Sequence, residues 1–402
     1  MTSARLPTLI AEHRRGHTLA REFYTDPAIF EADLERMLLK HWFCAGHDSS
    51  IARGGDYLTV DLGAESVILV RTPAGEVRAL LNVCRHRGSR LLGERCGHAA
   101  SGRLTCPYHA WSYGLDGQLL AARQMPASFR PGDMALRALP VRIVEGLIFT
   151  TFAARPLEFA AVEEALRRSA GVYGWGRAKV AHRELYSIAA NWKLAVENYM
   201  ECYHCQPAHP EFSKRHVYAR PAELREELER AGRRRAEALG IAVPTIDRYG
   251  CAAASGEESA DVMPSALFEG FSSATPDGRP GRMMGSFAAS DGNSTYFDIG
   301  PLSSFLAYPD HGIVYRFIPR SVNLTEMELI WLVDADAVQG EDYDLEQLTW
   351  LWRTTSLEDK KIVEMNQAGV NSRYFEPGPY STQEMHADRF VEWYLAELAI
   401  EP

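Results

Sequence analysis

The spacing of apolar and polar residues divides the chain into three regions. Residues 1–45 carry apolar side chains at helical spacing and are predicted to be helical. From 46 to 155, short alternating segments are separated by glycine, which predicts a small all-β domain. Helices and strands are mixed in 156–402, so this region is predicted to be a larger domain with a sheet and flanking helices. The expected fold class is therefore α+β.

Individual elements can be placed within these regions. A helix is expected to start at Asp26-Pro27, because proline is favoured in a first helical turn. Asp116-Gly117 is typical of a hairpin turn. The predicted strands are 56–60, 66–70, 76–80, 144–150, 295–299, 303–308, 313–318 and 325–333. The predicted helices are 158–172, 190–205, 221–239, 344–367 and 382–398.

Residues 252–294 are rich in Gly, Ser, Ala and Asp and show little periodicity. A connection of this length is usually a functional lid or a partly disordered segment. We therefore predict a mobile lid over an active site in this stretch.

Composition and charge exclude several classes of protein. The chain has 402 residues and a net charge of −10, which argues against binding to a nucleic-acid backbone. It contains no apolar run long enough to span a membrane, and its first residues lack the apolar core of a signal peptide. The seven cysteines are an odd number, which favours a reducing compartment. These features predict a cytoplasmic protein that binds neither nucleic acid nor membrane.

Two short clusters of cysteine and histidine lie within the β region. They are Cys84-x-His86 and Cys106-x-x-His109. Two thiolates and two imidazoles from separate loops are typical of a Rieske [2Fe–2S] centre. A structural zinc site uses the same ligand types, but in the usual finger order both cysteines precede both histidines. The mixed order favours the iron–sulfur centre over zinc.

A second candidate metal site lies near residue 204. His204 and His209 are five residues apart, too far round a continuous helix to share one metal ion. Pro207 and Pro210 break the helix and allow the second histidine to turn back. Two imidazoles and one carboxylate form the facial triad of non-haem Fe(II) enzymes. The plainer interpretation is two hydrogen-bonded histidines near a helix end.

The third ligand of such a triad is expected from a remote acidic segment. Residues 354–362 precede a helix rich in acids, and Glu358, Asp359 and Glu364 are the candidates. Their spacing alone does not choose among them.

These motifs together resemble the catalytic α subunit of the Rieske non-haem iron oxygenases over nearly the whole chain. The matching segments are 82–88, 106–109, 197–209 and 359–381. The resemblance implies that the third iron ligand is Asp359, with Glu358 as the second choice. It also implies that Glu201 bridges the two metal centres, contacting His204 and His109 of a neighbouring subunit. The implied ligands are Cys84, His86, Cys106 and His109 for the cluster, and His204, His209 and Asp359 for the iron.

The resemblance also implies the partners of the chain. A separate flavin or iron–sulfur reductase, itself using NAD(P)H, would supply electrons, and a homotrimer would bring the cluster of one subunit to the iron of the next. Oxygen would be the cosubstrate. A glutamate at position 201 and the segment Cys202-Tyr203-His204-Cys205 are similar to the branch that N-demethylates betaine-like quaternary ammonium compounds. The alternatives are an aromatic-ring hydroxylating oxygenase and, more remotely, an electron carrier or a zinc-binding structural protein.

Two further expectations concern the details of these sites. Cys96-Gly97-His98 repeats the Cys-x-His pattern, but it lies too close to Cys106 to serve as a separate ligand loop, so it is expected to be a surface insertion. Aromatic residues on the later strands are expected to line the pocket, with Arg282 or Arg316 available for a substrate carboxylate. The aromatic candidates are Tyr296, Phe297, Phe305, Tyr308 and Tyr315.

Overall fold

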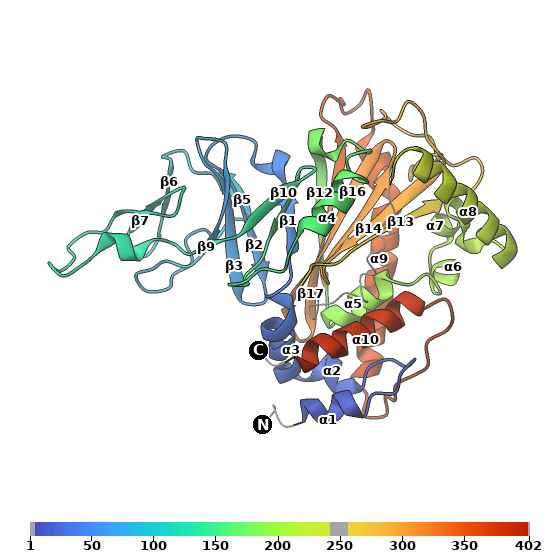
Figure 1. Cartoon of the computed structure of the whole chain (residues 1–402), viewed down its shortest axis with the longest axis horizontal. Helices are drawn as coiled ribbons and strands as arrows, with labels where there is room; N and C mark the ends of the chain where they lie inside the picture. The colour runs from blue at the N-terminus through green and yellow to red at the C-terminus, as the bar shows by residue number, and fades with distance from the viewer. Residues whose placement is uncertain (1–4, 242–255, 401–402) are drawn as a thin grey trace.

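The computed structural model describes residues 5–241 and 256–400. A helical N-terminal segment lies against the C-terminal helix, a β domain forms one end of the elongated molecule, and a sheet with flanking helices forms the rest (Figure 1). The N-terminal helices are α1 (Leu6–Ala11), α2 (Arg21–Thr25), α3 (Pro27–Asp33) and a π-helical turn (Leu34–Leu38).

The N-terminal segment confirms one predicted boundary and corrects another. Asp26 caps α3 by accepting a hydrogen bond from the backbone N–H of Ala28 at 2.9 Å, and Pro27 is its first residue. The helical region ends earlier than predicted, because strand β1 (Phe43–His47) begins before residue 45.

The β domain contains the strands that the alternation predicted. A five-stranded sheet has the order β5-β2-β3-β4-β9, and a smaller one the order β6-β7-β8. The predicted Asp116-Gly117 turn joins β7 to β8. The first sheet consists of β2 (Asp56–Leu62), β3 (Glu65–Arg71), β4 (Val77–Leu81), β5 (Cys96–His98) and β9 (Ala138–Leu139). The second consists of β6 (Arg103–Thr105), β7 (Ser112–Gly114) and β8 (Leu119–Ala121).

A third small sheet joins this domain to the rest of the chain, in the order β1-β11-β10. Residues 144–150 were predicted as one strand, but they form the end of β10 (Val141–Val144), a tight turn and β11 (Leu147–Thr150). Glu145 and Gly146 have φ of 47° and 75°, so the chain reverses there. Cys44 of β1 donates its backbone N–H to the Ser303 hydroxyl of the large sheet at 2.9 Å.

The large sheet is antiparallel throughout and is covered on both faces. Its order is β12-β17-β16-β15-β14-β13, and its faces contribute to two separate apolar cores. The strands are β12 (Ala178–Ile188), β13 (Ala260–Ala266), β14 (Asn293–Ile299), β15 (Ser303–Tyr308), β16 (His311–Ser321) and β17 (Leu324–Asp334). The last four confirm the prediction, whereas the edge strands β12 and β13 were missed.

Strand β13 also corrects the predicted lid. It lies within 252–294 and pairs along its full length with β14, so this part is a sheet edge. Residues 252–255 of that prediction lie outside the described residues.

Helices cover the large sheet and bring distant segments together. Helix α9 contacts α5 and β12, and α8 lies against β13. The helices are α4 (Ala160–Arg167), α5 (Trp192–Tyr199), α6 (Cys205–Ala208), α7 (Pro210–Arg215), α8 (Ala222–Ala238), α9 (Leu345–Val370) and α10 (Met385–Ala399). The α+β class is confirmed. None of the helices in the described part of the chain is both long and apolar enough to cross a membrane.

Candidate metal centres

The first candidate centre lies at the tip of the β domain. Cys84 follows β4, and Cys106 begins the turn between β6 and β7. Both side chains are buried, with 3% and 2% exposure, whereas His86 is exposed and His109 half-buried. The two imidazole rings lie 4.6 Å apart between centroids. Buried thiols with more exposed imidazoles match a Rieske cluster, in which cysteines hold one iron and histidines the other.

Neighbouring side chains hold this arrangement. The hydroxyl of Tyr113 lies 3.3 Å from Sγ of Cys84 and accepts the backbone N–H of Arg85 at 3.0 Å. The Trp111 ring stacks on His86 with centroids 4.7 Å apart. Burial raises the pKa of the Cys106 thiol, but backbone N–H groups of the turn outweigh this effect and lower the pKa. Sequence reasoning missed Tyr113, which follows the second motif as an ordinary strand residue.

The second Cys-x-His pattern lies apart from these ligands. Cys96 and His98 are exposed and form the edge strand β5, which pairs with β2. His98 Nδ1 lies 2.8 Å from a carboxylate oxygen of Asp56. The segment is therefore on the surface, as expected, where it forms a short edge strand.

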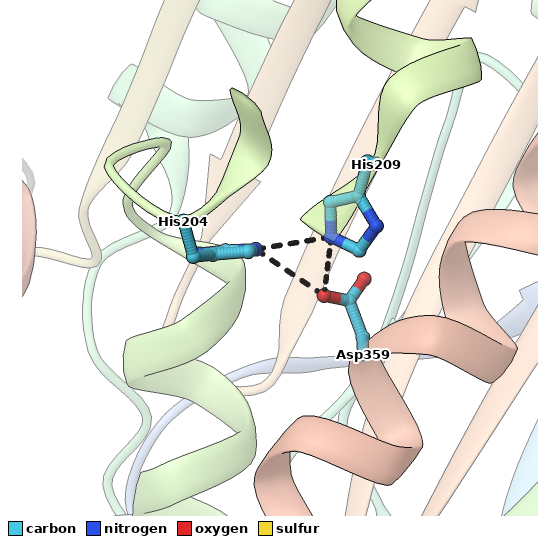
Figure 2. Close-up of side chains that lie close together, drawn as sticks. All are labelled: His204, His209 and Asp359. Carbon is cyan, nitrogen blue, oxygen red and sulfur yellow. Dashed lines mark hydrogen bonds and ion pairs between the residues drawn. The ribbon is translucent and has the colours of Figure 1, made fainter. Parts of the chain in front are cut away.

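The second candidate centre brings together three residues from two parts of the chain (Figure 2). Nε2 of His204 lies 3.1 Å from Nε2 of His209, and Oδ1 of Asp359 lies 3.3 Å and 2.9 Å from them, respectively. Ligands at right angles, each about 2.1 Å from a metal ion, lie about 3 Å from one another. These three atoms therefore fit one face of an octahedral metal site. They leave the opposite face for other ligands.

The backbone explains how two histidines five residues apart converge. Helix α5 ends at Tyr199, earlier than predicted, so both histidines lie beyond it. His204 precedes the short α6, and His209 lies between α6 and α7 with φ −122° and ψ 73°. Pro210 disfavours a helical conformation of His209 and redirects the chain. Pro207 lies inside α6 without interrupting it, so Pro210 is the proline that separates α6 from α7.

A carboxylate holds the other nitrogen of each imidazole. Nδ1 of His204 is hydrogen-bonded to Glu201, and Nδ1 of His209 lies 2.7 Å from Oε2 of Glu358. Carboxylates in this position fix ring orientation and make the imidazole a stronger ligand. Burial lowers the pKa of His204, but Asp359 and Glu201 outweigh this effect and raise the pKa to about 9. The pocket thus strongly stabilises positive charge.

The structure separates the three acids that spacing left open. Asp359 joins the two histidines, Glu358 contacts only the far side of His209, and Glu364 pairs with Lys360 and the backbone N–H of Ala189. Sequence reasoning missed that Glu358 contacts Nδ1 of His209 and supports this ring. A carboxylate directly beside the ligand was the available signal.

A cavity of about 370 Å³ opens from this centre. Its metal end is formed by the segment after α5 and by α9, and its other walls come from α8, β13, β14 and the start of α10. Arg225 is half-buried in the wall and donates to Oε1 of Gln383 at 3.3 Å, while Arg233 is exposed. The aromatic rings in the lining are Tyr199, Phe212, Tyr218, Tyr296 and Trp352.

This lining corrects most of the predicted pocket residues. Of the five predicted aromatics, Tyr296 lines the cavity, whereas the others are buried in the two cores of the sheet. Arg316 is buried against Glu328 at 2.8 Å, and Arg282 pairs with surface aspartates. Alternation along a strand sends neighbouring side chains to opposite faces, and periodicity does not show which face meets a cavity.

Comparison with known protein families covers both halves of the chain. The family described as "Rieske [2Fe-2S] domain" matches residues 41–141. The family described as "Ring hydroxylating alpha subunit (catalytic domain)" matches residues 175–399.

Individual proteins agree with these matches. The glycine betaine monooxygenase oxygenase subunit of Pseudomonas aeruginosa is 35% identical over 97% of this chain and 92% of its own length. The carnitine monooxygenase oxygenase subunit of Escherichia coli K12 is 38% identical over 50% of this chain and 55% of its own. Among solved structures, a quaternary ammonium Rieske monooxygenase has a TM-score of 0.73 at 24% identity, covering 98% of both chains. Naphthalene 1,2-dioxygenase has a TM-score of 0.68 at 18% identity, covering 96% of this chain and 93% of its own.

Proposed function

This chain belongs to the ring-hydroxylating oxygenase α subunits with an N-terminal Rieske domain, and we propose from that premise its substrate, site residues and assembly. It is an oxidoreductase, the terminal oxygenase of a system in which a separate reductase provides electrons. Its cofactors are a [2Fe–2S] cluster and a mononuclear iron, which supply electron transfer and O₂ activation when bound.

The proposed cluster ligands are Cys84, His86, Cys106 and His109. The buried thiols and adjacent imidazoles support this set. The proposed iron ligands are His204, His209 and Asp359, supported by the three atoms that converge within 3.3 Å. Glu201 and Glu358 are proposed to orient the two histidines through their Nδ1 atoms.

The proposed substrate is a small quaternary ammonium compound with a carboxylate, such as a betaine. The observation that carries this proposal is the cavity lining, in which five aromatic rings and several carboxylates accompany Arg225. A quaternary ammonium has no hydrogen-bond donor, so aromatic faces and acidic groups are what can bind it. A guanidinium on α8, away from the elements carrying the iron ligands, is suited to the carboxylate at the other end of the substrate. The names of the relatives in Pseudomonas and Escherichia support the same class.

The proposed reaction is oxidative N-demethylation. One oxygen atom is inserted into a C–H bond of an N-methyl group, and the other leaves as water with two electrons and two protons. The resulting hemiaminal splits its C–N bond to give formaldehyde, the demethylated amine and a proton. The role of the chain is to place one methyl group at the open face of the His204, His209 and Asp359 triangle and to exclude bulk water.

The experiment is an assay of the purified oxygenase with a reductase and NAD(P)H over a panel of N-methyl betaines and aromatic acids. We expect formaldehyde to be released in proportion to the O₂ consumed, and only when the substrate is a betaine. A cis-dihydrodiol or phenol from an aromatic acid, with no formaldehyde from any N-methyl compound, would replace this proposal with ring hydroxylation.

A homotrimer is proposed as the working assembly. In Figure 1 the β6–β7 hairpin, which carries Cys106 and His109, lies at the outer end of the β domain, away from α6 and α9. This separation supports electron transfer between subunits, with Glu201 linking His204 to His109 of a neighbouring subunit. The free thiols Cys44 and Cys96, which are not proposed as ligands, support a reducing compartment, and we propose that the protein is cytoplasmic.

A further inference from the structure

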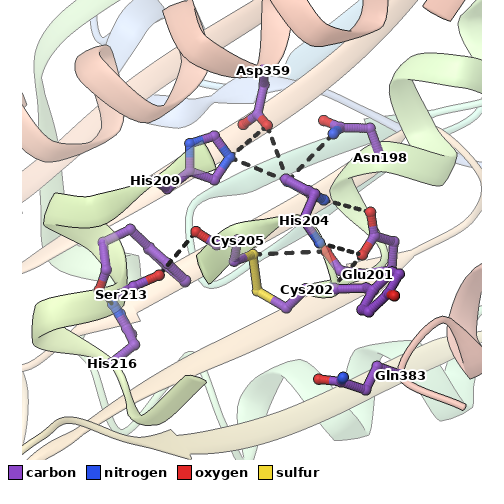
Figure 3. Close-up of a disulfide and its surroundings, with 12 residues drawn as sticks. Asn198, Glu201, Cys202, His204, Cys205, His209, Ser213, His216, Asp359 and Gln383 are labelled. Carbon is purple, nitrogen blue, oxygen red and sulfur yellow. Dashed lines mark hydrogen bonds and ion pairs between the residues drawn. A yellow bond between two sulfur atoms is a disulfide. The ribbon is translucent and has the colours of Figure 1, made fainter. Parts of the chain in front are cut away.

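A disulfide lies in the wall of the active-site cavity. It joins Cys202 to Cys205, whose Cα atoms are 4.8 Å apart, and it encloses the proposed iron ligand His204 (Figure 3). Both cysteines line the 370 Å³ cavity. The odd number of cysteines predicted a reducing compartment, where disulfides are usually transient and have a catalytic or sensing role.

The turn around this disulfide is held by hydrogen bonds that do not depend on the sulfur–sulfur bond. The backbone N–H of Cys205 donates to the carbonyl of Cys202 at 3.3 Å. The Glu201 carboxylate accepts the backbone N–H groups of Tyr203 and His204. When reduced, the Cys205 thiol has an acceptor, because its Sγ lies 4.0 Å from the carbonyl oxygen of Glu201. The same turn can therefore accommodate the dithiol and the disulfide.

The two cysteines differ in exposure. Cys202 is half-buried, whereas Cys205 is only 5% exposed. A small oxidant in the cavity can therefore reach Cys202 first, with Cys205 within bonding range to complete the reaction. Cys44 differs from this pair, because burial raises the pKa of its thiol to about 11 and keeps it unreactive.

The disulfide also connects the two segments that carry the histidines. The carbonyl of Cys205 accepts the backbone N–H of His209 at 2.9 Å and the hydroxyl of Ser213 at 2.9 Å. Cys202 adjoins Glu201, which holds Nδ1 of His204. A bond between the sulfurs thus ties the turn of His204 to the segment of His209.

We propose that Cys202 and Cys205 form a reversible thiol–disulfide pair that takes up oxidising equivalents beside the iron site. Hydrogen peroxide oxidises the Cys202 thiol to a sulfenic acid and releases one water. The Cys205 thiol then attacks this sulfur, forming the disulfide and releasing a second water. A dithiol reductant restores both thiols through a mixed disulfide and is itself oxidised. The source of peroxide, O₂ reduction uncoupled from substrate oxidation, rests on the proposed oxygenase function, but the chemistry of the pair does not.

The test uses the full-length, cluster-loaded and iron-bound protein, reduced with dithiothreitol and freed of it anaerobically. Hydrogen peroxide is then added and quenched, and the remaining free thiols are alkylated. Peptide mass spectrometry reports the oxidation state of each cysteine. We expect Cys202 and Cys205 to become resistant to alkylation together, because they form one internal disulfide. Renewed reduction should make both cysteines reactive again. Their behaviour should be the same in a Cys96→Ser control, which removes the exposed cysteine outside the pair.

The Cys205→Ser variant makes the test sharper. Without its partner, Cys202 should proceed to the irreversible sulfinic acid, and the variant should lose iron faster under peroxide than the wild type does. Three results would overturn the proposal: thiols that remain alkylatable, direct over-oxidation of Cys202 in the wild type, or a disulfide that dithiothreitol does not open in the folded protein. Because peroxide is added directly, the result is independent of whether the formaldehyde assay succeeds.

Discussion

Glu358 lies 2.7 Å from Nδ1 of His209, while Asp359, the next residue along α9, lies 2.9 Å from Nε2 of the same ring. Two consecutive carboxylates therefore contact opposite nitrogens of one imidazole. The first sets the orientation and basicity of the ring, and the second is placed to share a metal ion with it. Their roles should separate cleanly in variants.

Asp359→Ala should remove the mononuclear iron and abolish turnover, whereas Glu358→Ala should weaken iron binding by about 10–100-fold. Both variants should keep the visible spectrum of the iron–sulfur cluster, since neither residue lies in the β domain. Metal analysis after dialysis against a graded chelator measures the difference. Full iron content in Asp359→Ala would show that the third ligand lies elsewhere.

Glu201→Gln should retain both metal centres and still fail to turn over. The amide can keep a hydrogen bond to His204, but it removes the negative charge that holds the ring. Single-turnover mixing of the reduced protein with O₂ and substrate should show a cluster that reoxidises much more slowly than in the wild type. Reoxidation at the wild-type rate would rule out Glu201 as the link between subunits.

Arg225→Met should raise KM for a betaine by about 10–100-fold, since a charge-assisted hydrogen bond contributes about 1.5–3 kcal/mol. An N-methyl ammonium substrate that lacks the carboxylate should show no such change. Arg234→Met is the matched control, because Arg234 lies on the same helix but outside the active-site cavity. Equal losses for both substrates would assign Arg225 a structural role instead.

Cys84→Ser should abolish the visible absorption of the cluster, and Cys96→Ser should leave it unchanged. Cys84 is buried beside Tyr113, whereas Cys96 is exposed on an edge strand. Absorption and electron paramagnetic resonance spectra after anaerobic reduction distinguish the two. A spectrum lost in Cys96→Ser and kept in Cys84→Ser would reverse the ligand assignment.

The protonated His41 ring should stabilise the protein, and this contribution should be lost as pH rises. Burial lowers its pKa, but Glu258 at 3.0 Å and Glu397 at 3.9 Å outweigh this effect and raise the pKa to about 9. A raised pKa means that the protonated ring stabilises the fold fully below about pH 6.5 and that this contribution is lost as pH rises through about 9. The rise in pKa from 6.5 to about 9 corresponds to about 3 kcal/mol. Urea unfolding of the iron-bound wild type at several pH values should show this loss in the free energy of unfolding. In His41→Gln and in Glu258→Gln, the free energy of unfolding should depend less on pH.

The sequence predicted the elements whose signal is local. Strands β2, β3 and β4, helix α8 and the long helix α9 follow directly from periodicity. The edge strands β12 and β13 were missed, because β12 does not alternate regularly between polar and apolar residues and β13 contains a proline. Their strand conformation depends on pairing with β17 and β14, which is a tertiary effect.

The same distinction applies to the site. His204 and His209 could be proposed as a metal-binding pair from their spacing and the neighbouring prolines, whereas the preference for Asp359 over Glu358 came from the family resemblance. Only the fold shows which carboxylate on α9 faces which histidine nitrogen, because Glu358 and Asp359 are adjacent in sequence and lie 149 and 150 positions from His209. The cavity lining from α8 could not be read from a helix whose charged pattern indicates only a solvated surface.

The cavity walls have separate origins, which has a consequence for how such proteins diversify. The end that carries the proposed iron ligands is built from α9 and the turn after α5, where a displaced atom would disturb the three converging ligand atoms. The opposite wall is built from α8 and β13, and β13 is the last strand of the sheet, paired on one side only. We expect substitutions and insertions there to leave His204, His209 and Asp359 in place, so that new substrates can be acquired by evolution or by directed mutagenesis without rebuilding the proposed metal site.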